Sequence, residues 1–335
     1  MSAADARTTV LLATPMLAGM RDALAPRFDV LGPLPTPFRE ALVALPAADA
    51  ARVRVLVSLG TIHVGAAQLD RLPALGLVCC LGSGYEGVDV AAARDRGVVV
   101  THSPAANAAT VADLAMGLMI ASIRQMYAAT DYLRRGDWAL RPPVYVPRVR
   151  GLTGRRVGIY GLGAIGEKIA RRAAAFETEV GYHNRKPRTD VAWPYFATLH
   201  ALAEWADVLV VAVRADAGNR RTGDASVLAA LGRDGHVVNI ARGSVIDEAA
   251  LIAALRAGVI AGAGLDVFER EPAVPAELQA LPNAVLTPHI AGNTLEAQAA
   301  MERMVCANID AFVAGRPVPT PVPGSAATYA PVAAA

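Results

Sequence analysis

Three polar residues suited to acid–base and anion chemistry follow short apolar runs in the second half of the chain. Arg242 follows one run directly, in Asn239-Ile-Ala-Arg-Gly-Ser244; Glu271 lies shortly after another, and His289 lies in Thr287-Pro-His-Ile290. If each run is a strand of one doubly wound parallel sheet, all three lie beyond carboxyl ends of strands, where such sheets bind ligands. The pattern predicts one site that contains all three side chains.

The three residue types together point to a particular chemistry. A guanidinium stays charged and can bind a carboxylate or polarise a carbonyl. A carboxylate beside an imidazole favours the protonated ring and fixes its orientation, which makes histidine a usable proton donor near neutral pH. Taken singly, Arg242 could form a salt bridge at a strand end, Glu271 could be a solvated acid and His289 a packing histidine. As a set, downstream of a nucleotide motif, they suit hydride transfer to a 2-keto acid.

That nucleotide motif is rich in glycine. Strand-forming residues Arg155–Tyr160 run into Gly161-Leu-Gly163-Ala-Ile-Gly166, and helix-forming residues Glu167–Phe176 follow. In dinucleotide-binding turns the first glycine permits a tight turn and the second lets the backbone approach a pyrophosphate at the helix N-terminus. The third lets the helix pack closely on its strand. Such turns also occur without a nucleotide, but the flanking elements favour a dinucleotide site.

The next strand candidate, Val180–His183, indicates which dinucleotide is bound. A chain that prefers NAD usually presents an acid there to the ribose 2′-hydroxyl. Here Asn184, Arg185 and Lys186 follow, and Lys186 is one of only two lysines in the chain. A guanidinium can bind a 2′-phosphate through two hydrogen bonds, and the ammonium adds a point charge. A solvated turn is the alternative. The sequence predicts NADPH/NADP, with NADH as a weaker cofactor.

Apolar runs alternate with helical stretches along the whole chain, which predicts an α/β fold. Continuous apolar strands separated by helices are typical of parallel sheets covered on both faces. One uninterrupted helix is expected over Val111–Leu133, with Thr110 as its cap, and another over Leu295–Ala314. The remaining strand candidates are Val10–Ala13, Val53–Leu59, Leu77–Leu81, Val98–Thr101, Val157–Tyr160, Val208–Val213, Val237–Ile240, Gly262–Val267 and Ala284–Thr287.

Composition narrows the class of protein. The 335 residues are 54% hydrophobic and 19% charged, with a net charge of +2, which predicts two ordered domains and no field suited to nucleic acid or a membrane surface. No apolar run reaches membrane-span length, and the N-terminus does not resemble a secretory signal. Cys79, Cys80 and Cys306 show no metal-ligand spacing. We expect a cytoplasmic protein without a metal.

These motifs, in this order, resemble the D-2-hydroxyacid dehydrogenase family, and within it NADPH-dependent glyoxylate/hydroxypyruvate reductases. The resemblance covers nearly the whole chain. It rests on Leu81-Gly-Ser-Gly-Tyr-Glu-Gly-Val-Asp89, Ala112-Asp-Leu-Ala115, Val157–Gly166, Val238-Asn-Ile-Ala-Arg-Gly243, Gly264-Leu-Asp-Val-Phe268 and Thr287-Pro-His289. It implies two Rossmann-like doubly wound parallel-sheet domains with a cleft between them. The substrate-binding domain would comprise residues 1–104 and 290–335, and the dinucleotide-binding domain residues 105–289. It also implies a homodimer.

The resemblance implies a role for each site residue. Arg242, Glu271 and His289 would be catalytic, and Asp266 would lie near the nicotinamide carboxamide. Substrate contacts would come from Leu81, Gly82, Ser83, Gly84, Arg242 and His289. The full cofactor set is Gly161, Gly163, Ala164, Ile165, Gly166, Asn184, Arg185, Lys186, Val213, Ile240, Ala241, Arg242, Asp266, His289 and Gly292.

The sequence leaves alternatives for the contacts of one loop and for the function. Residues Val213–Ala217 depart from the proline-rich loop of many relatives, which leaves their contacts undefined. The substrate could be a larger 2-keto acid, of the 2-ketogluconate or phenylpyruvate type. Pocket volume decides between the two: Tyr85, Trp138 and Tyr145 could narrow the site, although aromatic residues more often serve packing. A nucleotide-sensing protein that lost the chemistry is a third possibility, against which the intact Arg242, Glu271 and His289 argue.

Overall fold

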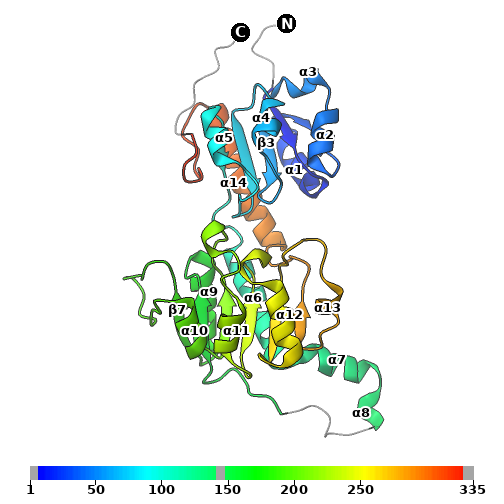
Figure 1. The fold of residues 1–335 in the computed structure, drawn as a ribbon. Helices are drawn as coiled ribbons and strands as arrows, with labels where there is room; N and C mark the ends of the chain where they lie inside the picture. The colour runs from blue at the N-terminus through cyan, green and yellow to red at the C-terminus, as the bar shows by residue number, and fades with distance from the viewer. Residues whose placement is uncertain (1–6, 141–147, 327–335) are drawn as a thin grey trace. The chain divides into compact units, whose positions relative to one another are not determined.

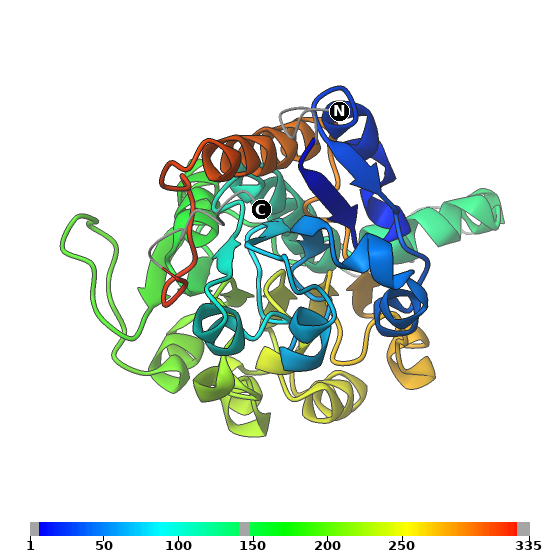
Figure 2. The same cartoon turned by 90° about the horizontal axis from the view of Figure 1, so that it is seen from above.

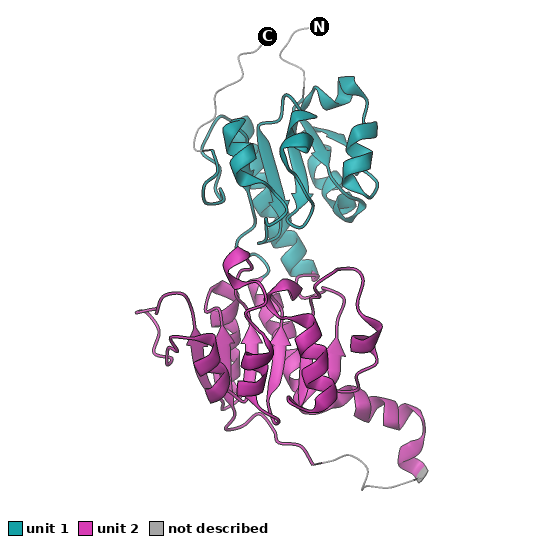
Figure 3. Cartoon of the chain, viewed as in Figure 1, with its two compact units in different colours: residues 1–107, 295–335 teal, residues 108–294 magenta. Residues whose placement is uncertain are grey.

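The computed structural model describes residues 7–140 and 148–326, and the chain divides into two compact units (Figures 1 and 3). Unit 1 consists of residues 1–107 with 295–335, and unit 2 of residues 108–294. Each unit contains one parallel sheet with helices on both faces. The predicted α/β class with two doubly wound parallel sheets is confirmed. No helix in the described ranges is long and apolar enough to cross a membrane.

The sheet of unit 1 has five strands in the order β2-β1-β3-β4-β5, all parallel. Chain order reverses between β1 and β3, where a doubly wound sheet has its switch point. The sequence did not predict β2, whose three residues are too few to show a pattern. The strands are β1 (Thr9–Leu12), β2 (Asp29–Leu31), β3 (Val53–Leu59), β4 (Leu77–Leu81) and β5 (Val99–Thr101).

Helices bury both faces of this sheet. Apolar side chains of α2, α4 and α5 cover one face, and those of α1 and α14 cover the other. Figures 1 and 2 both show α14 running along the sheet, where it packs on β4. The helical segments are η1 (Pro15–Leu17), α1 (Ala18–Leu24), α2 (Phe38–Ala44), α3 (Ala47–Ala50), α4 (Ala66–Asp70), α5 (Val90–Asp95) and α14 (Leu295–Val313).

The sheet of unit 2 has six parallel strands in the order β11-β10-β9-β8-β6-β7. Beyond β7, Tyr182 forms a single bridge with Tyr195, where a Rossmann sheet has its third strand. The switch point therefore lies between β6 and β8. The strands are β6 (Arg156–Tyr160), β7 (Glu179–His183), β8 (Val208–Val211), β9 (His236–Asn239), β10 (Gly262–Leu265) and β11 (Ala284–Leu286).

Helices α6 and α9 cover one face of this sheet, and α10, α11 and α12 cover the other. The segments are α6 (Ala108–Ile123), α7 (Met126–Arg134), α8 (Asp137–Leu140), α9 (Ala164–Ala175), α10 (Leu199–Trp205), η2 (Ala217–Asn219), α11 (Ala225–Leu231), η3 (Gly243–Val245), α12 (Glu248–Ala257) and α13 (Ala276–Gln279). Figures 1 and 2 show α7 and α8 leading away from the sheet of unit 2.

The prediction of one helix over Val111–Leu133 was wrong. Gln125 has a left-handed φ of 50°, which separates α6 from α7. Thr110 is not a cap, because α6 already begins at Ala108. The apolar spacing continues across the break, but α6 packs on the sheet and α7 buries none of its residues. Periodicity alone therefore missed the point at which the chain leaves the core.

Candidate active site

The glycine turn after β6 has the stereochemistry that a dinucleotide site requires. Gly161 has a φ of +101°, and a Cβ there would lie 2.5 Å from the backbone N of Val213. A Cβ on Gly166 would lie 2.0 Å from the carbonyl oxygen of Gly161, so the helix could not pack this closely. A Cβ on Gly163 would meet nothing within 4 Å. Open space over Gly163, at the start of α9, fits a pyrophosphate bound by first-turn N–H groups.

The loop after β7 uses its three predicted cofactor residues differently. The Asn184 side-chain oxygen accepts a hydrogen bond from the Leu162 N–H at 2.7 Å, which ties this loop to the glycine turn. The side chain of Arg185 is 93% exposed, and its Nη1 lies 3.5 Å from Oδ2 of Asp216. Lys186 is also exposed. Asn184 therefore shapes the turn, while two cations stand in solvent beside it.

The unusual loop after β8 is a closed turn. The Asp216 N–H donates to Oδ1 of Asn219 at 2.8 Å, and the Asn219 side-chain amide donates to the carbonyl of Arg214 at 2.7 Å. Oδ1 of Asp216 accepts from the Gly218 N–H at 2.8 Å. The turn thus holds an acid beside Arg185, a contact between residues 31 positions apart that the sequence did not reveal.

Arg188 is a further cation of this loop, and the sequence did not single it out. Its Nη1 lies 2.8 Å from Oε2 of Glu167 on α9 and donates to the carbonyl of Leu162 at 3.2 Å. It also pairs with Asp190. Its closeness in sequence to Arg185 was the available signal. Because Arg188 is held by two acids, it braces the glycine turn, whereas Arg185 remains exposed.

The predicted residues Glu271 and His289 are in hydrogen-bonding contact in unit 2. Nδ1 of His289 lies 2.7 Å from Oε2 of Glu271, and Oε1 of Glu271 accepts from the Phe268 N–H at 3.1 Å. Burial acts to raise the pKa of Glu271. The hydrogen bonds from His289 and Phe268 and the charges of His289 and Arg242 outweigh that effect, and the pKa lies below its ordinary value. The carboxylate therefore remains ionised at neutral pH.

Arg242 lies on a turn that the Asn239 side chain shapes. Oδ1 of Asn239, at the end of β9, accepts from the Ala241 N–H at 3.0 Å, and its Nδ2 donates to the carbonyl of Arg242 at 3.1 Å. A Cβ on Gly243 would lie 1.9 Å from the carbonyl carbon of Phe268. The Arg242 turn consequently lies directly against the segment that holds Glu271.

Asp266 positions the His289 loop. It is fully buried, and its Oδ1 accepts from the Thr287 hydroxyl at 2.6 Å and the Ile290 N–H at 2.9 Å. Its Oδ2 accepts from the Ala291 N–H at 2.9 Å. His289 has a left-handed φ of 52°, uncommon for a residue with a side chain. The Asp266 carboxylate holds this conformation in place, a role in addition to the nicotinamide contact that the resemblance implies.

The other predicted residues of unit 2 lie around the same edge of the sheet. Ile240 and Ala241 follow β9 and are buried, and Val213 lies against Gly161. Gly292 follows the loop that Asp266 holds. Among the residues that the structure describes, no group of three or more His, Cys, Asp or Glu could hold a metal ion.

The predicted substrate loop belongs to unit 1. Leu81 ends β4, and Gly82 has a φ of +112°, which favours glycine. A Cβ on Gly60, at the end of β3, would lie 1.9 Å from the carbonyl oxygen of Gly84, so the two backbones touch. Of the aromatic residues considered for pocket size, Tyr85 is buried, Trp138 is 54% exposed on α8, and Tyr145 lies outside the described residues.

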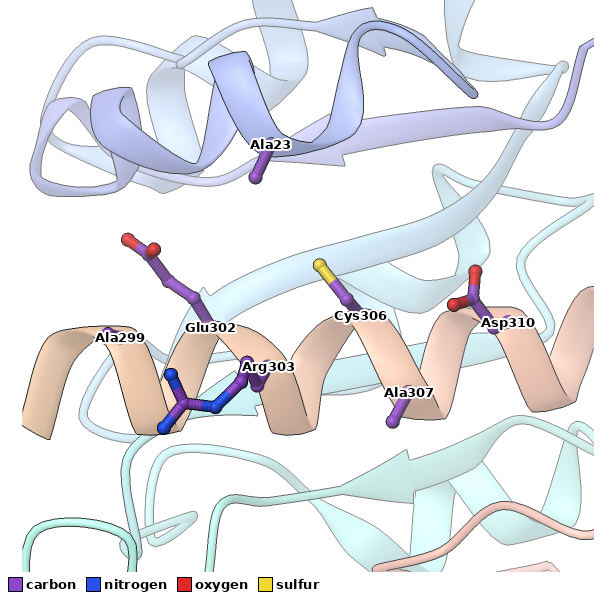
Figure 4. Close-up of a pocket in the computed structure, with 7 residues that line it drawn as sticks. All are labelled: Ala23, Ala299, Glu302, Arg303, Cys306, Ala307 and Asp310. Carbon is purple, nitrogen blue, oxygen red and sulfur yellow. The ribbon is translucent and has the colours of Figure 1, made fainter.

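A groove of about 420 Å³ lies elsewhere on unit 1, along α14 (Figure 4). One of its lining residues comes from α1 and the others from α14. None of them was predicted to be a site residue. They are Ala23, Ala299, Glu302, Arg303, Cys306, Ala307 and Asp310.

Comparison with known proteins identifies the family. A family model described as D-isomer specific 2-hydroxyacid dehydrogenase, NAD binding domain, matches residues 116–291, all within unit 2. Glyoxylate/hydroxypyruvate reductase A of Arabidopsis thaliana is 36% identical over 313 residues, covering 93% of this chain and 98% of that protein. The 2-ketogluconate reductase of Gluconobacter oxydans is 39% identical over 272 residues, covering 81% of this chain and 86% of that protein.

A solved structure agrees over nearly the full length. The NADPH-dependent glyoxylate/hydroxypyruvate reductase of Sinorhizobium meliloti, in complex with NADP and malonate, is 37% identical and superposes with a TM-score of 0.89. The match covers 97% of this chain and 99% of that one. The resemblance seen in the motifs is confirmed, and the chain belongs to the D-isomer-specific 2-hydroxyacid dehydrogenase family.

Proposed function

We propose that this protein reduces small 2-keto acids, such as glyoxylate and hydroxypyruvate, to D-2-hydroxy acids with NADPH. One observation carries the proposal: the 2.7 Å contact between Glu271 and His289, with the charge of Arg242 acting on it. This trio follows strands of the sheet whose first turn is the glycine motif. Relatives that span nearly the whole chain are named for the same reduction.

The side chains divide the chemistry between them. Bound NADPH would supply a hydride to the keto carbon. Because Nδ1 of His289 faces Glu271, the proton for the carbonyl oxygen comes from Nε2 of the protonated ring. Arg242 binds the carbonyl oxygen and one carboxylate oxygen, which stabilises negative charge as it develops. Glu271 keeps the ring charged and oriented.

The two units would serve different ligands. We assign cofactor binding to unit 2 through the predicted set from Gly161 to Gly292, supported by the family-model match. We assign substrate binding to unit 1, where the loop from Leu81 to Gly84 would bind the substrate carboxylate through the N–H groups of Ser83 and Gly84. The predicted boundaries after residues 104 and 289 lie close to the division of the compact units, after residues 107 and 294.

Arg185 and Lys186 would give the enzyme its preference for NADPH over NADH. Both are exposed at the end of β7, where a 2′-phosphate could exchange places with the Asp216 carboxylate beside Arg185. The S. meliloti relative was solved with NADP. NADH would bind more weakly, because it offers these cations no phosphate.

A larger 2-keto acid is the second candidate, because other relatives are named 2-ketogluconate reductase and hydroxyphenylpyruvate reductase. The test is NADPH oxidation with glyoxylate, hydroxypyruvate, pyruvate, 2-ketogluconate and phenylpyruvate in parallel. We expect the highest kcat/KM for glyoxylate or hydroxypyruvate. A preference for either larger acid would replace it with the second candidate. NADPH binding without oxidation by any of them would indicate a nucleotide-sensing protein.

We further propose a cytoplasmic homodimer. The segment α7–α8 leaves the sheet of unit 2 and exposes large apolar side chains, each more than half exposed: Met126, Tyr127, Leu133 and Trp138. Patches of this kind mark contact surfaces between proteins. Cys79, Cys80 and Cys306 are free thiols in the structure, as is usual for proteins of a reducing compartment. Sedimentation of wild type and of a Tyr127→Ser, Trp138→Ser double variant would test the assembly.

A further inference from the structure

The Gly82–Gly84 loop of unit 1 is held by its carbonyl groups. The Ser103 N–H donates to the carbonyl of Gly82 at 2.7 Å. Nδ1 of the His102 ring lies 2.9 Å from the carbonyl oxygen of Ser83. Because a carbonyl oxygen can only accept, this ring nitrogen must carry a hydrogen and donate it. Two consecutive peptide groups are thus fixed by residues that directly follow β5.

Fixing a carbonyl also fixes the N–H of the same peptide group. In a trans peptide the C=O and the next residue's N–H lie in one plane and point in opposite directions. The bond from Ser103 to Gly82 therefore directs the N–H of Ser83 away from β5. The bond from His102 to Ser83 does the same for the N–H of Gly84. These are the two donors assigned to the substrate carboxylate.

His102 is itself held firmly. Its N–H donates to the carbonyl of Thr320 at 3.2 Å, and its carbonyl accepts from the Thr320 hydroxyl at 2.6 Å. Thr320 is in turn bonded twice by Asn308 of α14, a side chain only 1% exposed, at 2.8 and 3.1 Å. The His102 ring also stands edge-on to Tyr85, with centroids 5.2 Å apart. These hydrogen bonds fix the backbone of His102, and its ring contacts both Tyr85 and Ser83.

We propose that His102 is a positioning residue for substrate binding, which aims the N–H of Gly84 at the keto-acid carboxylate. The inference rests on the proposed function of the Gly82–Gly84 loop. It concerns recognition of the carboxylate and not hydride or proton transfer. Loss of the His102 hydrogen bond should therefore raise the KM for a keto acid and leave kcat and the KM for NADPH nearly unchanged.

The test compares substitutions at this one position in the full-length enzyme. His102→Asn keeps an N–H donor at the same distance from the backbone, whereas His102→Leu has similar size and no donor. His102→Gln carries its donor one methylene farther out, and remains informative if the leucine variant fails to fold. His200→Asn, an exposed histidine of α10, controls for loss of a histidine elsewhere. Steady-state kinetics with glyoxylate and NADPH, and melting temperatures, are measured for all.

The leucine and glutamine variants should show KM values for glyoxylate about three- to tenfold higher, the usual worth of one hydrogen bond. The asparagine variant should stay within about twofold of wild type by the same reasoning. An unchanged KM in the leucine or glutamine variant would overturn the proposal. An asparagine variant with a KM raised as much as in the leucine and glutamine variants would also overturn it, because the shape of the ring and not its N–H would then matter. A wild-type enzyme that reduces no keto acid would instead refute the proposed function.

Discussion

Replacing Glu271 by Gln tests the electrostatic core of the proposed mechanism. The substitution keeps the size of the side chain and removes its charge. In the wild-type structure Oε2 of Glu271 lies 2.7 Å from Nδ1 of His289, and the two side chains are 32% and 38% exposed. A neutral amide can still accept a hydrogen bond from Nδ1. What it cannot do is stabilise the positive charge that the ring needs as a proton donor.

The magnitude follows from the distance and the exposure. Two unit charges about 4 Å apart interact by about 4 kcal/mol at an effective dielectric constant of about 20. Because about a third of each side chain is exposed, solvent screening reduces this to about 1–2 kcal/mol. An energy of about 1.4 kcal/mol corresponds to about a tenfold change in rate. Glu271→Gln should therefore lower kcat/KM for glyoxylate by about tenfold.

The assay is NADPH oxidation with glyoxylate between about pH 5.5 and 9, the range in which a positioned histidine acts as an acid. Glu269→Gln is the matched control, because Glu269 is a neighbouring acid that pairs with Arg220 and Arg221. The control should retain the wild-type profile. A Glu271→Gln profile that superimposes on that of wild type would refute the role of this carboxylate.

Three further changes probe other parts of the molecule. Replacing His289 by Asn removes the proton donor and should lower kcat by about 10²–10⁴-fold at unchanged melting temperature; near-normal turnover would dismiss its role. Replacing both Arg185 and Lys186 by Gln should raise the KM for NADPH about tenfold or more, the worth of lost charge-assisted bonds, with little effect on NADH; equal effects on both cofactors would show that the loop does not contact the 2′-phosphate. Burial lowers the pKa of His236 from its ordinary value of about 6.5 to about 4. Between these two values the unfolded chain binds a proton that the folded protein does not bind. The free energy of unfolding should therefore be highest above about pH 6.5 and fall by up to about 3 kcal/mol as the pH drops toward 4. Denaturant melts of wild type and His236→Gln should differ in this acid dependence, and equal slopes would contradict the assignment.

Several features of the fold could be predicted because they depend on neighbours in the chain. The strand before Gly161 and the helix after Gly166 follow from local pattern, and the structure shows why glycine is required at both positions. Buried strands such as β4, with Cys79 and Cys80, are continuous apolar runs that need no distant partner to be recognised. Short elements were harder. The three residues of β2 and the single bridge at Tyr195 exist only because a neighbouring strand is present.

The sequence supplied the residue types of the candidate site, but it did not reveal the contacts that these residues make. Arg242, Glu271 and His289 stood out because polar residues at strand ends converge in a parallel sheet. The same argument applied to β5 would have singled out His102, which directly follows that strand. Nothing local indicated that Asp216 meets Arg185, or that both Asp266 oxygens hold the His289 loop.

The sequence by itself therefore determined the family, the two α/β halves, the nucleotide turn and the candidates for the reactive side chains, because each is encoded by residue type and short-range spacing. Tertiary structure alone decided which carbonyl, carboxylate or guanidinium each side chain meets. Those contacts join segments tens to hundreds of residues apart, as between Asn308, Thr320 and His102. They form only when parallel strands align their carboxyl ends and helices pack behind them, since hydrogen bonds at these distances require positions that the local chain does not specify.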